Sequence, residues 1–540
     1  MKRKSVSLAI SLVVLLLFGT AGSVLASEVV GSTAGTTSNA NVPWAYQMQN
    51  QQNTGFSPET RINAANVGTL APAWSIPLNN LAGTPVVVKG IVYVAGPPFV
   101  YAVNEKTGAL VWEDGPSTGL APFSYRTAVG VAVSGGKVFE ATDNNILVSL
   151  NAKTGALNWM ANITSTLVGN LYPYEGAEAA PLVYNGMLIV GETQGDTGPT
   201  RGVVQAFSES NGAHLWTFYT VPPGPINSTN QAFYQSTWGT NGTAGCYCGG
   251  GAVWNVPAVD PTTGIIYFGT GNPYATNNPF VRQPSQADTN LYSESIIALN
   301  SKNGQLVWYH QETNPAYTDW DQGMPVQLFN VTIHHVKTEI VGVGGKAGIY
   351  FELNAATGAV IHDVPVGIHL NDDVPDTSVN STGFTMYPGD DGGDNTFSSF
   401  SSNTNMIYTM ALNDPSHCQA TKALIKCSTD SVAPNSTLYA INAATGSVVW
   451  STNLAGRAGG VSSADNLVFY SDGNHTFYAA NAKTGAVLWQ YNDPTGSAFL
   501  WSWGPPAIVD GLALWTTYGL SNTPGHLIAF SLGGTDSVEP

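Results

Sequence analysis

The sequence predicts an all-β fold, a single eight-bladed β-propeller, on three observations. First, a short motif, Asn or Ser followed by Gly four residues later and usually Trp four residues after that, recurs seven times. Second, a run of alternating apolar residues precedes and follows each copy, as expected for strands joined by a hairpin. Third, the two ends of the chain carry what reads as two parts of one more unit. Units of about 40 to 50 residues with four strands each are typical of propeller blades.

The seven copies share one spacing, and a His takes the place of the final Trp in the fifth. They are Asn104–Trp112, Asn151–Trp159, Ser208–Trp216, Asn300–Trp308, Asn354–His362, Asn442–Trp450 and Asn481–Trp489. The Gly of each copy stands where a hairpin needs a positive φ. In propellers a recurring Trp of this kind packs between blades, so we interpret these seven positions as structural.

The eighth blade is expected to combine the two ends of the chain. Asn63–Trp74 would supply its first part, and His526–Leu532 its returning strand. Pairing the first and last strands closes the ring and hides two sheet edges. We therefore expect residues 44–540 to form one domain, after a flexible Ser-, Thr- and Gly-rich lead at residues 27–43. The wider gaps between copies, Trp216 to Leu299 and His362 to Leu438, are expected to form loops over one face.

The N-terminal residues predict an export signal. Lys2, Arg3 and Lys4 precede an apolar stretch, and small residues lead to a cleavage position after Ala26. The alternative is an uncleaved membrane anchor, because about 17 to 25 apolar residues can span a bilayer. No cysteine stands near this boundary, so a lipid anchor is not expected there. We expect a secreted or surface-associated protein without a stable membrane anchor after cleavage.

Cysteines and sequons agree with export. Cys418 and Cys427 stand nine residues apart in what reads as a polar loop, and we expect them to form a disulfide. Cys246 and Cys248 are too close for an easy bridge and are interpreted as buried thiols. Seven N-x-S/T sequons suit a glycoprotein, although such sequons arise readily in a chain rich in Asn and Thr.

Charge is the most informative bulk property of the chain. Only 10% of residues are charged, against about 25% in an ordinary soluble protein. Lys and Arg number 18, so little positive charge would accumulate when the carboxylates are protonated. We therefore expect a protein that stays folded in a strongly acidic exterior. A halophile's acidic surface is the alternative, but 35 acidic residues in 540 are sparse for one. The net charge of −17 at neutral pH argues against nucleic acid as a partner.

The stretch Gly245–Pro273 departs from the repeat and is the main candidate for a site. It contains three glycines, Gly249, Gly250 and Gly251, then Trp254, and it ends on Gly271-Asn272-Pro273. This order is similar to the heart of the pyrroloquinoline quinone (PQQ) alcohol dehydrogenase family and its PQQ-like propeller relatives. The resemblance implies that Trp254 lies under a flat ligand and that Asn272 reaches a calcium ion.

Three further positions match that family's pocket. The segment Tyr317–Asp321 resembles its D-x-W-D block, which implies that Asp321 is the catalytic residue. Lys346 matches the Lys or Arg that contacts the quinone oxygens, and Asn395 matches a pocket amide, although Thr396 stands where the family has Trp. Three of the candidate residues also have a purely structural interpretation: Asp321 as a turn cap, Lys346 as a solvated strand end and Trp254 as blade packing.

Departures from the quinone pattern are equally visible. The family's adjacent Cys pair has no counterpart, and Val129 stands where an Arg would bind the quinone. The calcium carboxylate can only be Asp196 or Glu192, and Gly323 replaces the extra Asp that would mark a lanthanide site. Calcium ligands must also be deprotonated to bind, which strong acid opposes.

Taken together, composition and eroded metal positions make the chain resemble the archaeal tetrathionate hydrolases of acidophilic sulfur oxidisers. The resemblance implies cofactor-free extracellular hydrolysis of tetrathionate to thiosulfate, sulfur and sulfate, with Asp321 transferring the proton. The small anionic substrate would be held by Trp254, Asn272, Lys346, Asn395 and the backbone N–H groups of Gly249, Gly250 and Gly251.

Two other functions remain open from the sequence. The first is a PQQ- and calcium-dependent alcohol dehydrogenase, with Asn272, Asp321 and Asp196 at the calcium ion. The second is a propeller scaffold without chemistry. The oligomeric state is also open, with a homodimer among the options.

Overall fold

The computed structural model describes the larger part of the chain. The described residues are 43–78, 81, 83–96, 99–114, 130–142, 145–164, 176–192, 201–221, 249–274, 290–312, 319–372, 380–389, 392–394, 396–420, 425–430, 432–494, 504–517 and 524–535. The export signal, Val129, Asp196, Cys246, Cys248 and Asn395 lie outside them. Within these ranges, no helix combines the length and the apolar character that a membrane span requires.

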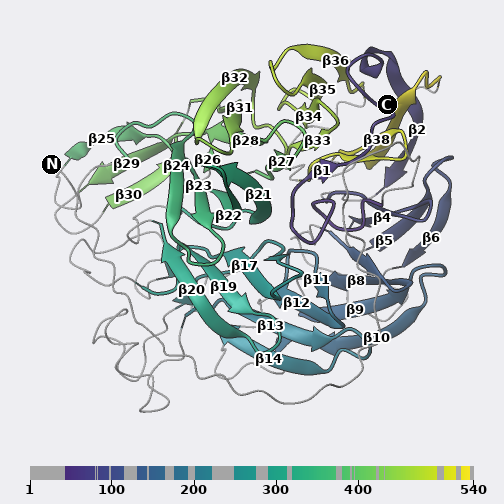
Figure 1. The fold of residues 1–540 in the computed structure, drawn as a ribbon, viewed down its shortest axis with the longest axis horizontal. Helices are drawn as coiled ribbons and strands as arrows, with labels where there is room; N and C mark the ends of the chain where they lie inside the picture. The colour runs from purple at the N-terminus through teal and green to yellow at the C-terminus, as the bar shows by residue number, and fades with distance from the viewer. Residues whose placement is uncertain are drawn as a thin grey trace. The chain divides into compact units, whose positions relative to one another are not determined.

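Eight blade sheets follow one another around a ring in chain order (Figure 1), which confirms the predicted all-β propeller. The first blade consists of β3 (Val86–Val88), β4 (Ile91–Gly96), β5 (Phe99–Asn104) and β6 (Leu110–Asp114). The second consists of β7 (Ala132–Ser134), β8 (Lys137–Ala141), β9 (Ile146–Asn151) and β10 (Leu157–Asn162). The third consists of β11 (Leu182–Tyr184), β12 (Met187–Gly191), β13 (Val203–Ser208) and β14 (His214–Tyr219). The next two consist of β16 (Ala258–Val259), β17 (Ile265–Gly269), β19 (Ser295–Asn300) and β20 (Gln305–Gln311); and β21 (Gln327–Ile333), β22 (Val336–Gly345), β23 (Ile349–Asn354) and β24 (Val360–Pro365).

The last three blades include strands from both ends of the chain. The sixth blade consists of β26 (Gly393–Asp394) and β27 (Ser399–Ser401) with β28 (Met406–Asn413), β31 (Asn435–Asn442) and β32 (Ser447–Ala455). The seventh consists of β1 (Phe56–Ser57) with β33 (Ser462–Ala464), β34 (Leu467–Ser471), β35 (Thr476–Asn481) and β36 (Val487–Asn492). The eighth consists of β37 (Ala507–Val509), β38 (Leu512–Thr516) and β39 (Gly525–Leu532) with β2 (Leu70–Leu78). The 3-10 turn η1 (Val67–Thr69) precedes β2. β2 thus pairs antiparallel with β39, the last strand of the chain that the structure describes, with Leu70 opposite Leu532. This pairing confirms the predicted ring closure.

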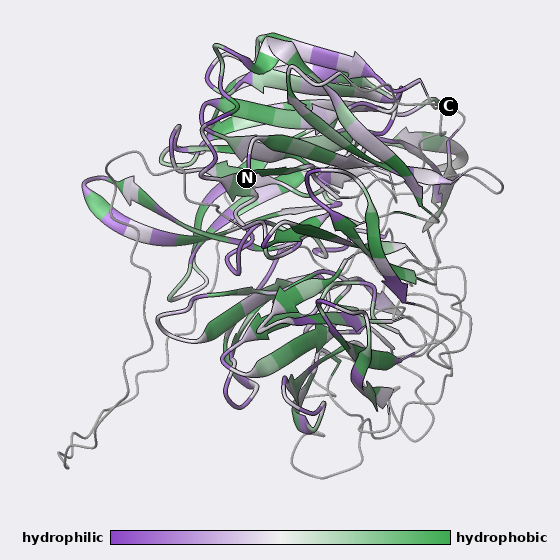
Figure 2. Cartoon of the chain, turned by 90° about the vertical axis from the view of Figure 1, so that its right-hand side faces the viewer, coloured by the Kyte–Doolittle hydropathy of each residue, from purple (hydrophilic) through white to green (hydrophobic). Residues whose placement is uncertain are grey.

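The recurring Trp residues join each blade to the next, as predicted. The indole nitrogen of Trp74 donates to the Glu105 carbonyl at 2.9 Å, and that of Trp112 donates to the Ala152 carbonyl at 3.1 Å. The same bond recurs from Trp216, Trp308, Trp450 and Trp489. The motif Gly lies under the ring: a Cβ on Gly108 would come within 2.8 Å of Trp74. His362 takes this place against Gly446. These contacts therefore support the structural interpretation of the repeat. In Figure 2 green covers many of the strands and purple many of the turns, although some strands are also purple or white.

Residues near the N-terminus cross the inner strands of several blades. The backbone of Gln51 accepts from Val259 of β16, Gln52 accepts from Leu328 of β21, and Thr54 accepts from Phe400 of β27, each at 2.8 to 2.9 Å. Buried Asn53 bridges two blades by donating to the Val256 and Val326 carbonyls. One short segment thus ties together the inner strands of three blades, through the second residue of each strand.

Two small sheets lie outside the blades. β15 (Gly249–Gly250) pairs with β18 (Pro273–Tyr274), and β25 (Asn380–Met386) pairs with β29 (Ser416–Ala420) and β30 (Ile425–Thr429). The second sheet lies at the edge of the ring beside β24 (Figure 1). It carries the predicted Cys418–Cys427 disulfide, which is confirmed. The expectation of a polar loop there is wrong: the two cysteines face each other across paired strands, and Cys418 is fully buried.

Several buried carboxyl groups hold their protons tightly. Burial raises the pKa of Asp394 and of Glu352 to about 8, and burial with the nearby Asp510 charge raises that of Glu105 to about 7. A raised folded-state pKa contributes stability that is complete below the unfolded value and is lost as pH rises through the folded value. Four histidines whose pKa burial lowers, His214, His310, His362 and His526, act oppositely, but only below about pH 6.5.

We therefore expect the unfolding temperature to fall by about 5 °C or more between pH 6 and pH 9. Calorimetry at constant ionic strength measures this directly. Replacing Glu105 by Gln, a neutral isostere, should remove part of the slope below pH 8. An unfolding temperature that rises steadily to pH 9 would show that these carboxyl groups do not govern stability.

Candidate active site

The candidate residues stand at the ends of neighbouring inner strands. Trp254 precedes β16 and Asp321 precedes β21, whereas Asn272 follows β17 and Lys346 follows β22. β17 is antiparallel to β16, and β22 is antiparallel to β21. Antiparallel pairing puts the end of one strand beside the start of its partner. Residues from four separate stretches of sequence are therefore delivered to the same end of two adjacent blades.

A buried lysine joins two aspartates at this end. Lys346 Nζ lies 2.6 Å from Asp319 Oδ2 and 2.9 Å from Asp321 Oδ2. The lysine is 7% exposed and Asp321 is 5% exposed. Burial opposes the lysine charge, but the charges and hydrogen bonds of both aspartates outweigh it and raise the pKa of Lys346 well above its usual value. The ammonium group is therefore charged over the whole range in which a protein folds.

Asn272 completes this group. Its backbone N–H donates to Asp321 Oδ1 at 2.6 Å, so Asp321 accepts from Asn272 through one oxygen and from Lys346 through the other. Gly271 makes the approach feasible, because a Cβ there would come within 2.9 Å of Asp321 Oδ1. We name Asn272, Asp319, Asp321 and Lys346 the acid–lysine cluster.

The Asn272 side chain offers two alternatives with different chemistry. One amide position lies 3.0 Å from Asp321 Oδ1 and 3.3 Å from Asp319 Oδ1. With the amide nitrogen there, Asn272 donates to both carboxylates. With the oxygen there, three oxygens converge, and oxygen atoms are the ligands that Ca²⁺ takes. The residues of the cluster therefore fit a hard cation, which would need further oxygen ligands to reach its usual six to eight.

Trp254 lies against Gly323 and packs on the buried core shared by the β16 and β21 blades. A Cβ on Gly323 would fall 2.1 Å from Trp254 Cε2, and the Asn255 amide donates to the Gly323 carbonyl. Gly323 is two residues from Asp321. A glycine is needed at position 323 because any side chain there would overlap the Trp254 indole ring. Gly323 also lacks the carboxylate that would mark a lanthanide site.

Replacing Gly323 by Ala is expected to destabilise the fold by about 1–3 kcal/mol, because the new methyl group overlaps the Trp254 ring and the surrounding core must shift. Urea unfolding measures the change. Gly68→Ala is the matched control, since a Cβ there meets nothing nearer than 3.6 Å. Equal effects of the two substitutions would mean that Trp254 does not press on Gly323.

The glycine run has a different role from the one expected. The Gly251 N–H donates to the Asn272 carbonyl at 2.9 Å, and Gly249 and Gly250 pair with the strand that follows Asn272. All three glycines are buried. The expectation that Gly251 offers its N–H group to a substrate is therefore wrong. The run instead fixes Asn272 from behind, and the φ of +64° at Gly251 requires glycine there.

The remaining predicted residues are only partly placed. Asn395 and Asp196 lie outside the described residues. Glu192, the other carboxylate considered for calcium, is buried and accepts a hydrogen bond from Gln205. Sequence reasoning missed Asp319 as a site residue, although it stands in the same D-W-D segment as Asp321. The available signal was the presence of two acids with one residue between them.

Comparison with known proteins identifies the family. Residues 44–383 match the family described as "Glucose/ethanol/alcohol dehydrogenase, beta-propeller domain", and residues 430–532 match "Outer membrane protein assembly factor BamB". The chain belongs to the glucose/ethanol/alcohol dehydrogenase β-propeller family. The resemblance to PQQ-like propellers is thereby confirmed.

Relatives in this family carry quinone dehydrogenase names. The chain is 31% identical over 394 residues to "Alcohol dehydrogenase (quinone), dehydrogenase subunit" of Gluconacetobacter polyoxogenes, covering 67% of this chain and 52% of that protein. It is 30% identical over 390 residues to "Quinohemoprotein alcohol dehydrogenase" of Comamonas testosteroni, covering 67% of this chain and 53% of that protein. The chain thus spans about half the length of these relatives.

Solved structures share the fold. The crystal structure of quinohemoprotein alcohol dehydrogenase from Comamonas testosteroni superposes with a TM-score of 0.77 at 24% identity, covering 92% of this chain and 82% of that one. A europium-containing methanol dehydrogenase superposes with a TM-score of 0.73 at 22% identity, covering 91% of this chain and 98% of that one.

These relatives overturn the expected reaction. Their names describe oxidoreductases that act with a quinone, so the expectation of a tetrathionate hydrolase, a hydrolase of sulfur–sulfur bonds in sulfur metabolism, is wrong. The expectation of a cofactor-free enzyme is wrong for the same reason, since these relatives are named for a quinone. The alternative weighed from the sequence, a quinone-dependent alcohol dehydrogenase, is the one that the relatives support.

Proposed function

We propose that this protein is a PQQ- and cation-dependent dehydrogenase that oxidises an alcohol. The observation that carries the proposal is the acid–lysine cluster, in which Asn272, Asp321 and Lys346 meet at the matching positions of the quinone family. Quinone alcohol dehydrogenases are also the relatives with the matching sequence.

Asn272, Asp319 and Asp321 would supply oxygen ligands to the cation. Lys346 would face the quinone oxygens, because an ammonium group has three donors and the two aspartates use two of them. Trp254 would support the flat ring from below. When bound, the quinone accepts the two electrons released by the alcohol, and the cation polarises it.

The chain's own acid–base chemistry centres on Asp321. Its carboxylate is held through both oxygens, by the Asn272 N–H at one and the Lys346 ammonium at the other. Oδ2, which accepts from Lys346 alone, keeps a further lone pair that can accept a hydroxyl proton. Asp321 is therefore assigned as the general base that takes the alcohol proton, and the fixed contacts keep it oriented for that transfer.

We also propose that the protein works outside the cytoplasm, in acid. The N-terminal sequence supports export, and a disulfide on a surface sheet is typical of an oxidising compartment. The sparse charge and the buried carboxyl groups described above support an acidic setting.

Purified protein incubated with PQQ and CaCl₂ tests the function. We expect reduction of an artificial dye that depends on added short-chain alcohols, is absent without PQQ and is lost after treatment with a chelator. The assay is run from pH 3 to pH 8 because the working pH is itself part of the proposal. Absence of alcohol-dependent dye reduction at every pH, in folded protein shown to bind PQQ, would refute the proposed reaction.

A further inference from the structure

Trp320 connects the acid–lysine cluster to the disulfide-bearing sheet. It stands between Asp319 and Asp321, whose carboxylates both reach Lys346 Nζ. The Trp320 ring packs against a small apolar cluster that contains Met386, Cys418, Phe384 and Cys427.

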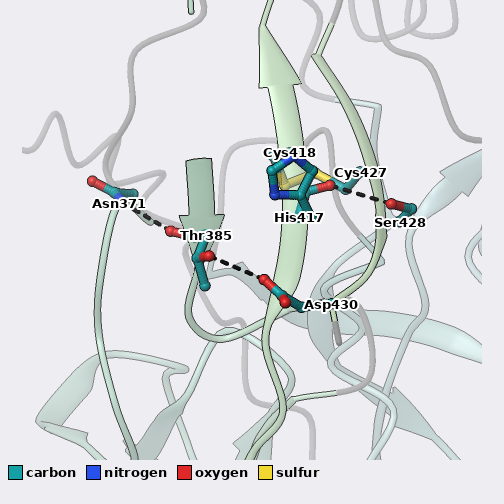
Figure 3. Close-up of a disulfide and its surroundings, with 7 residues drawn as sticks. All are labelled: Asn371, Thr385, His417, Cys418, Cys427, Ser428 and Asp430. Carbon is teal, nitrogen blue, oxygen red and sulfur yellow. Dashed lines mark hydrogen bonds between the residues drawn. A yellow bond between two sulfur atoms is a disulfide. The ribbon is translucent and has the colours of Figure 1, made fainter. Parts of the chain in front are cut away.

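This sheet has several anchors of its own. The Cys418–Cys427 disulfide joins β29 to β30. Backbone N–H groups of Leu370 and Tyr387 donate to each other's carbonyls at 2.9 Å, which ties the sheet to the end of the β24 blade. Figure 3 shows two more contacts: Asn371 donates to the Thr385 carbonyl at 2.8 Å, and Thr385 donates to Asp430 Oδ2 at 3.0 Å. The surface under Trp320 is thus a fixed one.

Most of the sheet lies in a part of the chain that neither family match covers. The two family matches end at residue 383 and resume at residue 430. β29, β30 and the end of β25 fall between them. The part of the chain that supports Trp320 therefore lies outside the sequence that identifies the family.

We propose that this three-stranded sheet is a brace, and that Trp320 is a positioning residue through which it holds Asp319 and Asp321 against Lys346. Trp320 does not touch the reacting groups. Its packing fixes the peptide on either side of it, so both carboxylates stay within hydrogen-bond distance of one ammonium group. Loss of the brace releases Asp319 first, because the side chain of Asp319 is 26% exposed whereas the side chain of Asp321 is only 7% exposed.

The Lys346 ammonium group itself is the readout. The chain has only 12 lysines, so protein labelled with ¹⁵N at lysine Nζ gives a simple spectrum, and Lys346→Arg identifies the Lys346 signal by its loss. In the wild type we expect a slowly exchanging Lys346 signal, because the group is buried and bound by two carboxylates. Trp320→Ala, and the double substitution Cys418→Ser with Cys427→Ser, should speed its exchange at least about tenfold, whereas Trp320→Phe should largely restore it.

Controls separate positioning from general damage. Ser428→Ala, on the exposed side of β30 next to Cys427, should leave the Lys346 signal unchanged. Thermal unfolding of every variant is measured, and the Lys346 signal in the folded double-cysteine variant decides the matter if Trp320→Ala does not fold. An unchanged Lys346 signal in folded double-cysteine and Trp320→Ala proteins would overturn the proposal.

The kinetic consequence rests on the proposed function. In active enzyme, loss of the brace should lower kcat, with a smaller change in KM. The two claims can fail separately. If the brace variants change the Lys346 signal but the wild type does not oxidise alcohols, the brace is supported and the proposed reaction is refuted. If the wild type oxidises alcohols but the brace variants leave the Lys346 signal unchanged, the reaction is supported and the brace is refuted.

Discussion

Asp321→Asn is expected to lower kcat for alcohol oxidation by about 10²–10⁴-fold, the usual contribution of a general base. The amide occupies nearly the same volume as the carboxylate, and its single oxygen can still accept from one of the two donors, Asn272 or Lys346, but it cannot take a hydroxyl proton. The unfolding temperature should change little by comparison. Steady-state kinetics on PQQ-loaded protein measure the loss, and bound quinone is quantified in the same samples.

Two controls make this result interpretable. Asp363→Asn, an exposed aspartate on β24, should leave kcat unchanged. Asp319→Asn should cost less than Asp321→Asn, because Asp319 holds Lys346 and is not assigned as the base. If Asp321→Asn with full quinone occupancy turned over at the wild-type rate, the base would have to be another group.

Lys346→Met is expected to destabilise the protein by about 3 kcal/mol, near the lower end of the cost of removing one partner from a buried ion pair. The methionine fills a similar volume, but two neighbouring carboxylates are left without their cation. Asp319 is partly exposed, so water relieves some of the cost. Urea unfolding at neutral pH measures the change.

The same strand supplies the control for this substitution. Lys337→Met alters an exposed lysine of β22 and should change stability by less than about 0.5 kcal/mol. Calcium should recover part of the loss in Lys346→Met, because a cation bound to Asn272, Asp319 and Asp321 replaces the missing charge. A stable Lys346→Met protein that does not respond to calcium would contradict the geometry of the cluster.

The fold could be predicted from the sequence because its information is local and repeated. The Gly and Trp of each copy fix a hairpin turn and the contact with the next blade, and seven copies leave little freedom for another architecture. The ring closure followed from the leftover segments near Trp74 and His526. The sheet of β25, β29 and β30 was not foreseen, because it occurs once and its cysteines stand in a polar sequence that resembles a loop.

The site was predictable residue by residue and not as a reaction. Asp321, Asn272 and Lys346 were found because each stands in a short motif outside the repeat. Asp319 and Trp320 were missed as functional residues because only the folded chain shows that one pairs with Lys346 and the other packs on Cys418. The reaction was predicted wrongly because a sparse overall charge does not show which reaction a few buried polar groups support.

The central claim is that the acid–lysine cluster and Trp254 form one quinone and cation site. Titration of the purified protein with PQQ, followed by absorbance with and without calcium, tests it most directly. The account predicts saturable binding of one PQQ per chain that weakens at least about tenfold without calcium or in Asn272→Ala protein. Absence of PQQ binding to folded wild-type protein, or binding indifferent to both calcium and Asn272→Ala, would contradict it.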